Sequence, residues 1–413
     1  MAFLINNNVI QQNQYRFLEK SNTTSAASFL INEIVTGLNQ KMKTACVFID
    51  VKKAFDCLNY DKMLEKLKQI GIRGKAFKVL ENYFENRKQV VIVNSIKSCE
   101  RNVDSGAAQW SVLGPILSIV YINDMLNLNV VSKGRLSADD AAFVTQAETY
   151  EDLYDMMSND LLKINSFFQS IHLQMSLKKT KFMTFRLRKN TSDNIFTSVH
   201  FDGEKIDVVD EFKYLRLIID SNLTWKSHVN SLASKISPTI GVIRKIRYLV
   251  TKKVLMQLYY SYIHSQLIYC LPVWASCPIK LRMKLQRLQS KVIKYIDFKP
   301  TLTPTVELYS QELLSFEKLC RYESILLIHK IASGLMRSDL IMLTKSQVIS
   351  RVTRQSNSIR LPQFIFKKCQ DSCFYRGILE YNEFTKSTNV TIREKISEAK
   401  TKIKKFSYLV KWN

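Results

Sequence analysis

The spacing of apolar positions predicts alternating helices and strands through the first half of the chain. The expected helices cover residues 25–40, 61–71, 75–86 and 148–171, with one more beginning at Gly114. The expected strands are Ala45–Ile49, Gln89–Val93, Phe182–Phe185, two short segments around Leu136 and Phe143, and a hairpin and strand within 199–219. This order predicts an α+β fold, with a mostly antiparallel sheet covered by helices on one face.

Beyond Trp225 the apolar pattern is mostly helical. A stripe with helical period runs from Leu281 to Ile296, and the basic residues of that segment fall largely outside the stripe. The segment from Val254 to Ser276 carries no formal charge and is apolar enough to raise the question of a membrane span. Its internal polar residues and basic flanks favour a buried helix pair instead.

The charge of the chain changes this picture by indicating the kind of partner. Lys and Arg number 61 against 36 Asp and Glu, which gives a formal net charge of +25 over 413 residues. A surplus of this size favours a polyanion such as nucleic acid, although a generically basic soluble protein would show it too. Residues 221–300 hold 14 of the basic residues and one acid, Asp297, so the expected nucleic-acid surface lies there.

The eight cysteines do not form a pattern typical of a metal site. None is part of a Cys-x-x-Cys pair, and Cys369 and Cys373 lie four residues apart without a nearby histidine. No signal peptide is apparent at the N-terminus. We therefore expect reduced thiols in an intracellular protein, without distinguishing nucleus from cytoplasm.

Three carboxylates stand at the ends or turns of apolar strands. Asp50 ends the first expected strand, and Asp139 and Asp140 lie between the two short segments around Leu136 and Phe143. Acidic residues in such places can meet at one edge of a sheet, where they bind hard cations such as Mg²⁺. The alternative for the Asp139-Asp140 pair alone is a solvated turn, and the carboxylates by themselves do not decide between the two.

Six segments resemble, in the family's order, the polymerase motifs of reverse transcriptases from non-LTR retrotransposons of the LINE or jockey type. They are Val47–Asp56, Asn59–Gly74, Gln109–Pro115 with Tyr121–Asp124, Ala138–Asp140, Lys179–Met183 and Phe212–Leu215. The resemblance covers roughly residues 14–295. It implies an RNA-directed DNA polymerase that uses an RNA template, a DNA primer, dNTPs and two Mg²⁺ ions.

The resemblance also implies a right-hand polymerase architecture. The expected domains are partial fingers at 1–45, a palm with the metal-binding carboxylates at 46–220, a basic helical thumb at 221–300, and a helical C-terminal region of unknown role at 301–413. In the palm, Asp50, Asp139 and Asp140 would hold the two metal ions. The sequence does not indicate an oligomeric state.

Five further residues take roles from the resemblance. The backbone at Val51 would contact the triphosphate, and Phe55 would reject a 2′-hydroxyl, although Phe55 is also compatible with a core position. Gln109 and Ser111 would lie beside the template and the incoming base. Lys179 would face the pyrophosphate and donate a proton to it, with a solvated surface cation as the alternative.

Several motif positions depart from the family's usual residues. Ser137 stands where an aromatic residue is usual, Leu18 where Arg is usual, and Trp110 and Arg216 stand where Gly is usual. Such changes indicate a truncated and partly decayed copy, in which the upstream fingers and the endonuclease are missing. The alternatives are a catalytically inactive relic that binds RNA or an RNA–DNA duplex, and a host gene that uses the fold structurally.

Overall fold

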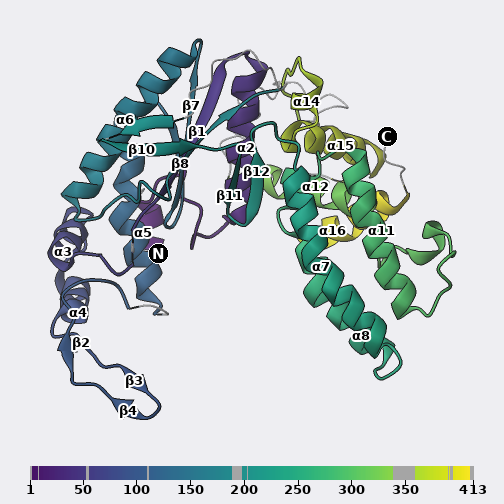
Figure 1. Cartoon of the computed structure of the whole chain (residues 1–413), viewed down its shortest axis with the longest axis horizontal. Helices are drawn as coiled ribbons and strands as arrows, with labels where there is room; N and C mark the ends of the chain where they lie inside the picture. The colour runs from purple at the N-terminus through teal and green to yellow at the C-terminus, as the bar shows by residue number, and fades with distance from the viewer. Residues whose placement is uncertain are drawn as a thin grey trace. The chain divides into compact units, whose positions relative to one another are not determined.

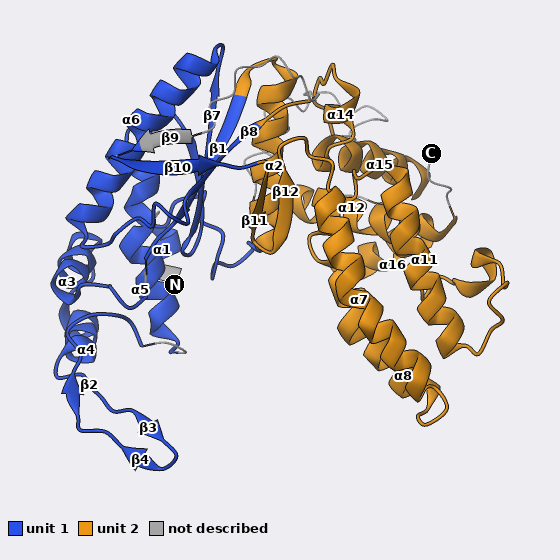
Figure 2. Cartoon of the chain, in the orientation of Figure 1, with its two compact units in different colours: residues 1–22, 44–184, 193–209 blue, residues 23–43, 185–192, 210–413 orange. Residues whose placement is uncertain are grey.

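The protein is described by a computed structural model that divides the chain into two compact units, shown separately in Figure 2. The described residues are 2–7, 9–52, 55–108, 111–187, 198–201, 203–337, 359–388, 390 and 394–409. Unit 1 contains residues 1–22, 44–184 and 193–209, and unit 2 contains residues 23–43, 185–192 and 210–413.

Unit 1 is built on a six-stranded sheet with the strand order β6-β7-β1-β8-β10-β9. The strands are β1 (Lys43–Asp50), β6 (Lys133–Ser137), β7 (Asp140–Ala147), β8 (Lys181–Phe185), β9 (Ser198–Phe201) and β10 (Glu204–Val208). The pairs β6–β7 and β9–β10 are antiparallel, whereas β8 and β10 are parallel. The apolar run at 45–49 is fully buried in β1, as a strand inside a sheet requires.

The helices of unit 1 pack against this sheet to form its core (Figure 1). They are α1 (Ala2–Asn6), α3 (Tyr60–Gln69), α4 (Gly74–Phe84), α5 (Leu113–Ile122), the 3₁₀-helix η1 (Asn123–Asn127) and α6 (Tyr150–Ser170). Asn59 caps α3 by accepting from the Lys62 amide, and Thr149 caps α6 by accepting from the Asp152 amide. The helices expected at 61–71, 75–86, 114 onward and 148–171 are confirmed.

The alternation after Gln89 forms a narrow ribbon that extends from α4 in Figure 1. Its strands are β2 (Lys88–Gln89), β3 (Ile92–Val93), β4 (Ile96–Lys97) and β5 (Arg101–Asn102). The strand β2 pairs with β5 and β3 pairs with β4, both antiparallel, so the expected strand Gln89–Val93 is divided between β2 and β3 on one side of a hairpin. All four strands are exposed.

Unit 2 is mostly helical, as the sequence pattern beyond Trp225 predicts. Its helices are α2 (Thr23–Asn39), α7 (Lys226–Ile246), α8 (Lys252–Leu258), the π-helix η2 (Tyr259–His264), α9 (Ser265–Ile268), α10 (Leu271–Trp274), α11 (Ile279–Ile296), η3 (Thr305–Leu308), α12 (Phe316–Ala332), α14 (Lys367–Gln370), α15 (Cys373–Thr388) and α16 (Ile396–Leu409). A two-stranded hairpin, β11 (Glu211–Tyr214) and β12 (Leu217–Asp220), precedes α7. Trp225 and Trp274 are the largest fully buried side chains of this unit among the described residues, and Phe316 is fully buried too.

The uncharged segment at 254–276 forms two helical runs, as expected: α8, η2 and α9 continue into one another from Lys252 to Ile268, and α10 follows. Cys270, in the left-handed region at φ 48°, separates α9 from α10. Over the described residues, no helix has both the length and the apolar character needed to cross a bilayer. With the mixed sheet of unit 1 and the helices of unit 2, the α+β class expected from the sequence is confirmed.

Candidate active site

Asp50 is the last residue of β1, and the chain after it is fixed by backbone hydrogen bonds. The Ser176 amide donates to the Asp50 carbonyl at 2.8 Å, and the Lys52 amide donates to the Gln174 carbonyl at 2.9 Å. Val51, which pairs with Met175 between them, is buried. The Asp50 carboxylate is therefore presented from a rigid backbone and not from a loose loop.

Asp139 and Asp140 lie at the turn between β6 and β7. Ser137 and Asp140 are the last paired residues of the two strands, so Ala138 and Asp139 form a two-residue turn. Ala138 has φ 57°, which a tight hairpin turn requires and which an alanine adopts only at a conformational cost. Both aspartates are exposed, while Ser137 and Ala138 are buried.

The three carboxylates lie close enough to share one electrostatic field. The pKa of Asp140 is raised to about 6, first by burial and then by the negative charges of Asp139 and Asp50, while the Arg16 guanidinium opposes the rise. The structure thus brings together the three acids that the sequence singled out. Within the described residues, however, no three His, Cys, Asp or Glu side chains are arranged to hold a metal ion on their own.

Lys179 is the nearest cation to Asp50 among the ion pairs of this site. Its Nζ lies 3.4 Å from Asp50 Oδ2, and both side chains are partly or largely exposed. The turn that carries Lys179 is fixed by the Lys179 and Thr180 amides, which donate to the Ser176 carbonyl at 3.0 and 2.8 Å. The lysine therefore approaches the carboxylates from the chain that leads into β8.

The turn that carries the paired aspartates is supported by a buried glutamine that the sequence analysis assigned no role. Gln14 Oε1 accepts from the amides of Tyr15, Arg16 and Ala138, at 3.0, 3.3 and 3.3 Å. The Tyr15 amide also donates to the Leu136 carbonyl at 2.9 Å. Gln14 therefore connects the segment before α2 to the residue that precedes Asp139.

Arg16, which the sequence analysis did not select, is the cation that this segment places near the carboxylates. Its side chain is exposed and lowers the pKa of Asp140, opposing the two acids. Leu18, which stands where the family has an arginine, is a buried core residue. The missing charge at Leu18 therefore leaves a well-packed apolar position, and a positive charge is present two residues earlier.

The segment around Gln14 is held from two further sides. The buried Asn123 accepts from the Gln11 amide at 3.0 Å and donates to the Val9 carbonyl at 2.7 Å. Arg135, on β6, donates to the Tyr15 hydroxyl at 2.8 Å. The motif Tyr121–Asp124 thus fixes the N-terminal segment beside the acidic turn.

The remaining site residues lie around the start of α5. Gln109 and Trp110 fall outside the described residues. Ser111 Oγ donates to the Ala108 carbonyl at 2.7 Å and accepts from the Gly114 amide at 2.9 Å. A Cβ at Gly114 would lie 2.8 Å from the Ala108 carbonyl oxygen, so only glycine allows this close turn.

Phe55 is half-buried, and its carbonyl accepts from the Ala107 amide at 2.8 Å. This bond connects the chain after β1 to the chain that leads into Ser111. The half-buried ring fits neither a full core position nor a free surface position.

In unit 2, the β11–β12 turn consists of Leu215 and Arg216, and both have positive φ, at 46° and 64°. The position at which the family has glycine is therefore one that requires a left-handed backbone. Arg216 adopts this conformation without the freedom that a glycine would bring.

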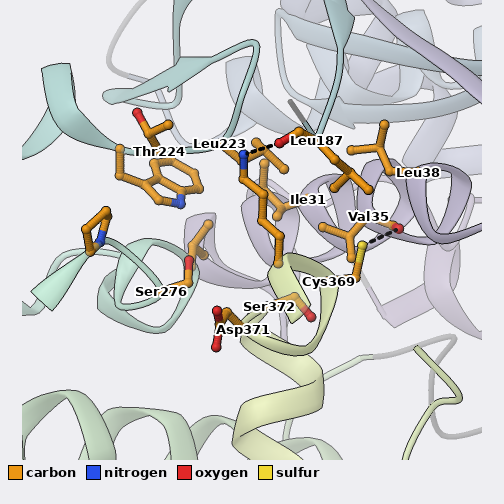
Figure 3. A pocket seen from close by; sticks show the side chains of 14 residues that line it. Ile31, Val35, Leu38, Leu187, Leu223, Thr224, Ser276, Cys369, Asp371 and Ser372 are labelled. Atoms are coloured by element: carbon orange, nitrogen blue, oxygen red, sulfur yellow. Dashed lines mark hydrogen bonds between the residues drawn. The ribbon is translucent and has the colours of Figure 1, made fainter. Parts of the chain in front are cut away.

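Two cavities in the described part of the chain are lined by other residues. The one in Figure 3, of about 330 Å³, lies within unit 2 between α2, α14 and the residues around Trp225. Its walls are mostly apolar, and Lys368 beside it donates to the Leu187 carbonyl at 3.1 Å. Burial lowers the pKa of Lys368.

A second apolar cavity, of about 550 Å³, lies between α1, α3, α4 and α5 in unit 1. Neither contains the three aspartates.

Comparisons with known proteins agree with the motifs. The RNA-directed DNA polymerase from mobile element jockey of Drosophila funebris is 24% identical over 300 residues, covering 70% of this chain and 32% of that protein. The probable RNA-directed DNA polymerases from transposons X-element and BS of Drosophila melanogaster are each 24% identical, over 56% and 70% of this chain and 26% and 33% of theirs. The chain spans about a third of the length of these relatives.

Among solved structures, the telomerase of Candida tropicalis in complex with a fragment of telomeric RNA is similar at 13% identity with a TM-score of 0.40. The match covers 80% of this chain and 53% of that chain. The model of the family described as reverse transcriptase (RNA-dependent DNA polymerase) matches residues 2–219, more than half of the chain. The chain therefore belongs to the reverse transcriptase family.

Proposed function

We propose that this chain catalyses RNA-templated DNA synthesis as the polymerase part of a non-LTR retrotransposon protein. The observation that carries the proposal is the gathering of Asp50, Asp139 and Asp140 at one place, with Lys179 Nζ 3.4 Å from Asp50 Oδ2. Acids placed this close repel one another, which does not stabilise the fold. A site that binds cations together with substrate phosphates, however, needs such clustered carboxylates. Family membership supplies the reaction class that fits such a site.

The residues present fit two Mg²⁺ ions. Asp50 Oδ2 accepts no hydrogen bond. The pKa of Asp140 is raised first by burial and then by the charges of Asp139 and Asp50, and a cation would neutralise those charges. Three protein ligands around one ion are not needed, because Mg²⁺ commonly uses one or two carboxylates together with substrate phosphates and water. Bound by Asp50, Asp139 and Asp140, two ions would lower the pKa of the primer 3′-hydroxyl and stabilise the leaving pyrophosphate.

Two cations near the acids would contact the phosphates of the incoming nucleotide. Lys179 stands beside Asp50, where its ammonium group would donate a proton to the leaving pyrophosphate oxygen. Arg16 lies near Asp140, and its guanidinium would bind the triphosphate in place of the arginine that is usual in the family at the position of Leu18. The backbone at Val51 and the ring of Phe55 would bound the nucleotide sugar and phosphates.

Two parts of the chain would contact the template and primer. Gln109 and Ser111, which shortly precede α5 in the sequence, would lie by the template and the incoming base. Residues 221–300, with 14 Lys or Arg against one acid, would hold the RNA template and DNA primer by their phosphates. The boundaries of partial fingers, palm, thumb and C-terminal region given above belong to this proposal.

Primer extension on an RNA template with dNTPs and Mg²⁺ tests the proposal directly. The variant Asp139→Ala/Asp140→Ala removes the paired acids, and Asp155→Ala, an exposed acid on α6, is the matched control. We expect extension by the wild type and by Asp155→Ala but not by the double variant. Template–primer binding without extension in the wild type would refute the polymerase proposal and favour the inactive nucleic-acid-binding relic.

A further inference from the structure

Unit 2 carries a cluster of three aromatic rings around one arginine, at the C-terminal ends of α7 and α11. The Arg247 Cζ lies 4.6 Å from the ring centroid of Tyr248, 5.5 Å from that of Tyr295 and 5.4 Å from that of Phe298. The Tyr248 and Phe298 centroids are 5.4 Å apart, with the ring planes tilted by 57°. We refer to these four residues as the Arg247 cluster.

Two rings of the Arg247 cluster, those of Tyr248 and Phe298, are exposed and do not pack in the core. Tyr248 is 71% exposed and Phe298 is 52% exposed, and the neighbouring Leu249 is 80% exposed. Adjacent exposed apolar side chains of this size are typical of interaction surfaces. Phe298 also has φ 53°, a conformation that costs a bulky residue about 1 kcal/mol or more and that burial of its ring does not offset.

The charge of the Arg247 cluster is not neutralised by its own protein. Among the described residues, no carboxylate forms an ion pair with Arg247. Its Nε is buried without an acceptor, and a terminal nitrogen donates to the Tyr248 hydroxyl. The single acid of this region, Asp297, is paired with Lys252 at 2.6 Å. The other charged side chains nearby in the sequence are all basic: Arg244, Lys245, Lys253, Lys291, Lys294 and Lys299.

Exposed rings around an arginine, in a basic segment whose single acid is already paired with Lys252, match one kind of ligand better than others. Single-stranded nucleic acid presents flat bases and phosphates together, and it binds by stacking on aromatic side chains within a basic groove. A duplex hides its bases and would use the cations alone. We propose that the Arg247 cluster is a stacking platform for unpaired bases of single-stranded RNA or DNA.

The Arg247 cluster lies within residues 221–300, which the proposed function assigns to contacts with template and primer phosphates. Stacking of unpaired bases on its rings adds a different kind of contact and does not require polymerase activity. The three aspartates belong to unit 1, whereas every residue of the Arg247 cluster belongs to unit 2. A chain without polymerase activity would still bind single strands through these rings. The two proposals can therefore fail separately.

The test compares single-stranded and duplex binding by the full chain. Labelled U12 RNA and a 12-base-pair duplex are titrated at one fixed salt concentration by fluorescence anisotropy. The variant Tyr248→Ala/Phe298→Ala removes both exposed rings and no charge, and Tyr262→Ala, a 59% exposed tyrosine of η2, is the matched control. Because one base stack contributes about 1–3 kcal/mol, we expect the Kd for U12 to rise at least about tenfold in the double variant.

Duplex affinity and the affinities of Tyr262→Ala should stay within about twofold of the wild type, since no cation is removed. A second variant, Tyr248→Trp, should keep U12 affinity and show tryptophan quenching on U12 but not on the duplex. Unchanged U12 affinity in the double variant would overturn the proposal and leave the patch to a protein partner. An equal loss for U12 and duplex would overturn it too, because stacking would then not be the interaction removed.

Discussion

Replacing Gln14 by methionine should loosen the turn that carries Asp139 and Asp140 while keeping the volume of the side chain. In the wild type, Gln14 Oε1 accepts from the Arg16 and Ala138 amides at 3.3 Å each and is itself fully buried. Methionine has no strong acceptor, so both amides lose this bond, the Ala138 amide in a buried place and the Arg16 amide in a partly buried one. The Tyr15 amide keeps its bond to the Leu136 carbonyl, and its loss is therefore small.

The magnitude follows from the groups left without an acceptor. An unsatisfied buried donor costs about 1–3 kcal/mol, so two weakly bonded amides cost about 2–4 kcal/mol together. Gln14 Nε2 is buried without a partner in the wild type, and its removal returns about 1 kcal/mol. We expect the free energy of unfolding to fall by about 1–3 kcal/mol in Gln14→Met.

At a temperature where the Gln14→Met variant is still folded, the rate of primer extension should nevertheless fall strongly. A shift of about 1 Å in a catalytic group can reduce the rate about 100-fold, and Ala138 immediately precedes the two acids. The assays are urea unfolding and primer extension at 15 °C, where the variant stays folded. The control is Gln69→Met, the same substitution at an exposed residue of α3, which should change neither quantity measurably. A Gln14→Met protein with wild-type extension rate would refute the positioning role of this residue.

Three further predictions concern other residues. Arg16→Leu should raise the KM for dNTPs about tenfold with a smaller effect on kcat, because it removes one charge-assisted contact to the triphosphate; an unchanged KM in steady-state primer extension would exclude that contact. Arg216→Gly should increase the free energy of unfolding by about 0.5–1 kcal/mol in urea melts, because φ 64° strains an arginine and not a glycine. Burial, and secondarily Lys235, lowers the pKa of His228 to about 4, so stability is lost as pH falls below 6.5. Between pH 7.5 and 5 the wild type should lose about 2 kcal/mol that His228→Gln does not lose, and parallel curves would contradict the shifted pKa.

The secondary structure of this chain follows from local patterns in the sequence. A continuous apolar run predicts the strand that ends at Asp50. A capping residue, Asn59, followed by apolar residues at helical spacing predicts the next helix. The position of the break between the two helical runs of residues 254–276 was not predicted, because the left-handed backbone at Cys270 follows from tertiary packing and not from any glycine or asparagine signal.

The candidate site was predictable in part. The acids and Lys179 could be found because they end or precede apolar strands in motifs of a known family. Gln14 was missed because its importance depends on a contact with Ala138, and Arg16 because its importance depends on its proximity to Asp140, each more than a hundred residues away. Gln14 itself, the first residue of the segment in which Leu18 replaces the usual arginine, could have indicated this site. Position-by-position comparison with the family drew attention to Leu18 instead, where the family has arginine.

The assignment of α2 to unit 2 has a consequence for the synthesis of this protein. This helix is almost entirely apolar on its buried side, and it packs against α10, α14 and α15. The ribosome completes Asn39 when the first of these partners, which begins at Leu271, is still 232 residues away. At about 5–20 residues per second, the apolar face of α2 waits roughly 10–50 s for its partners. During translation we therefore expect the apolar face of this helix to be a binding site for chaperones.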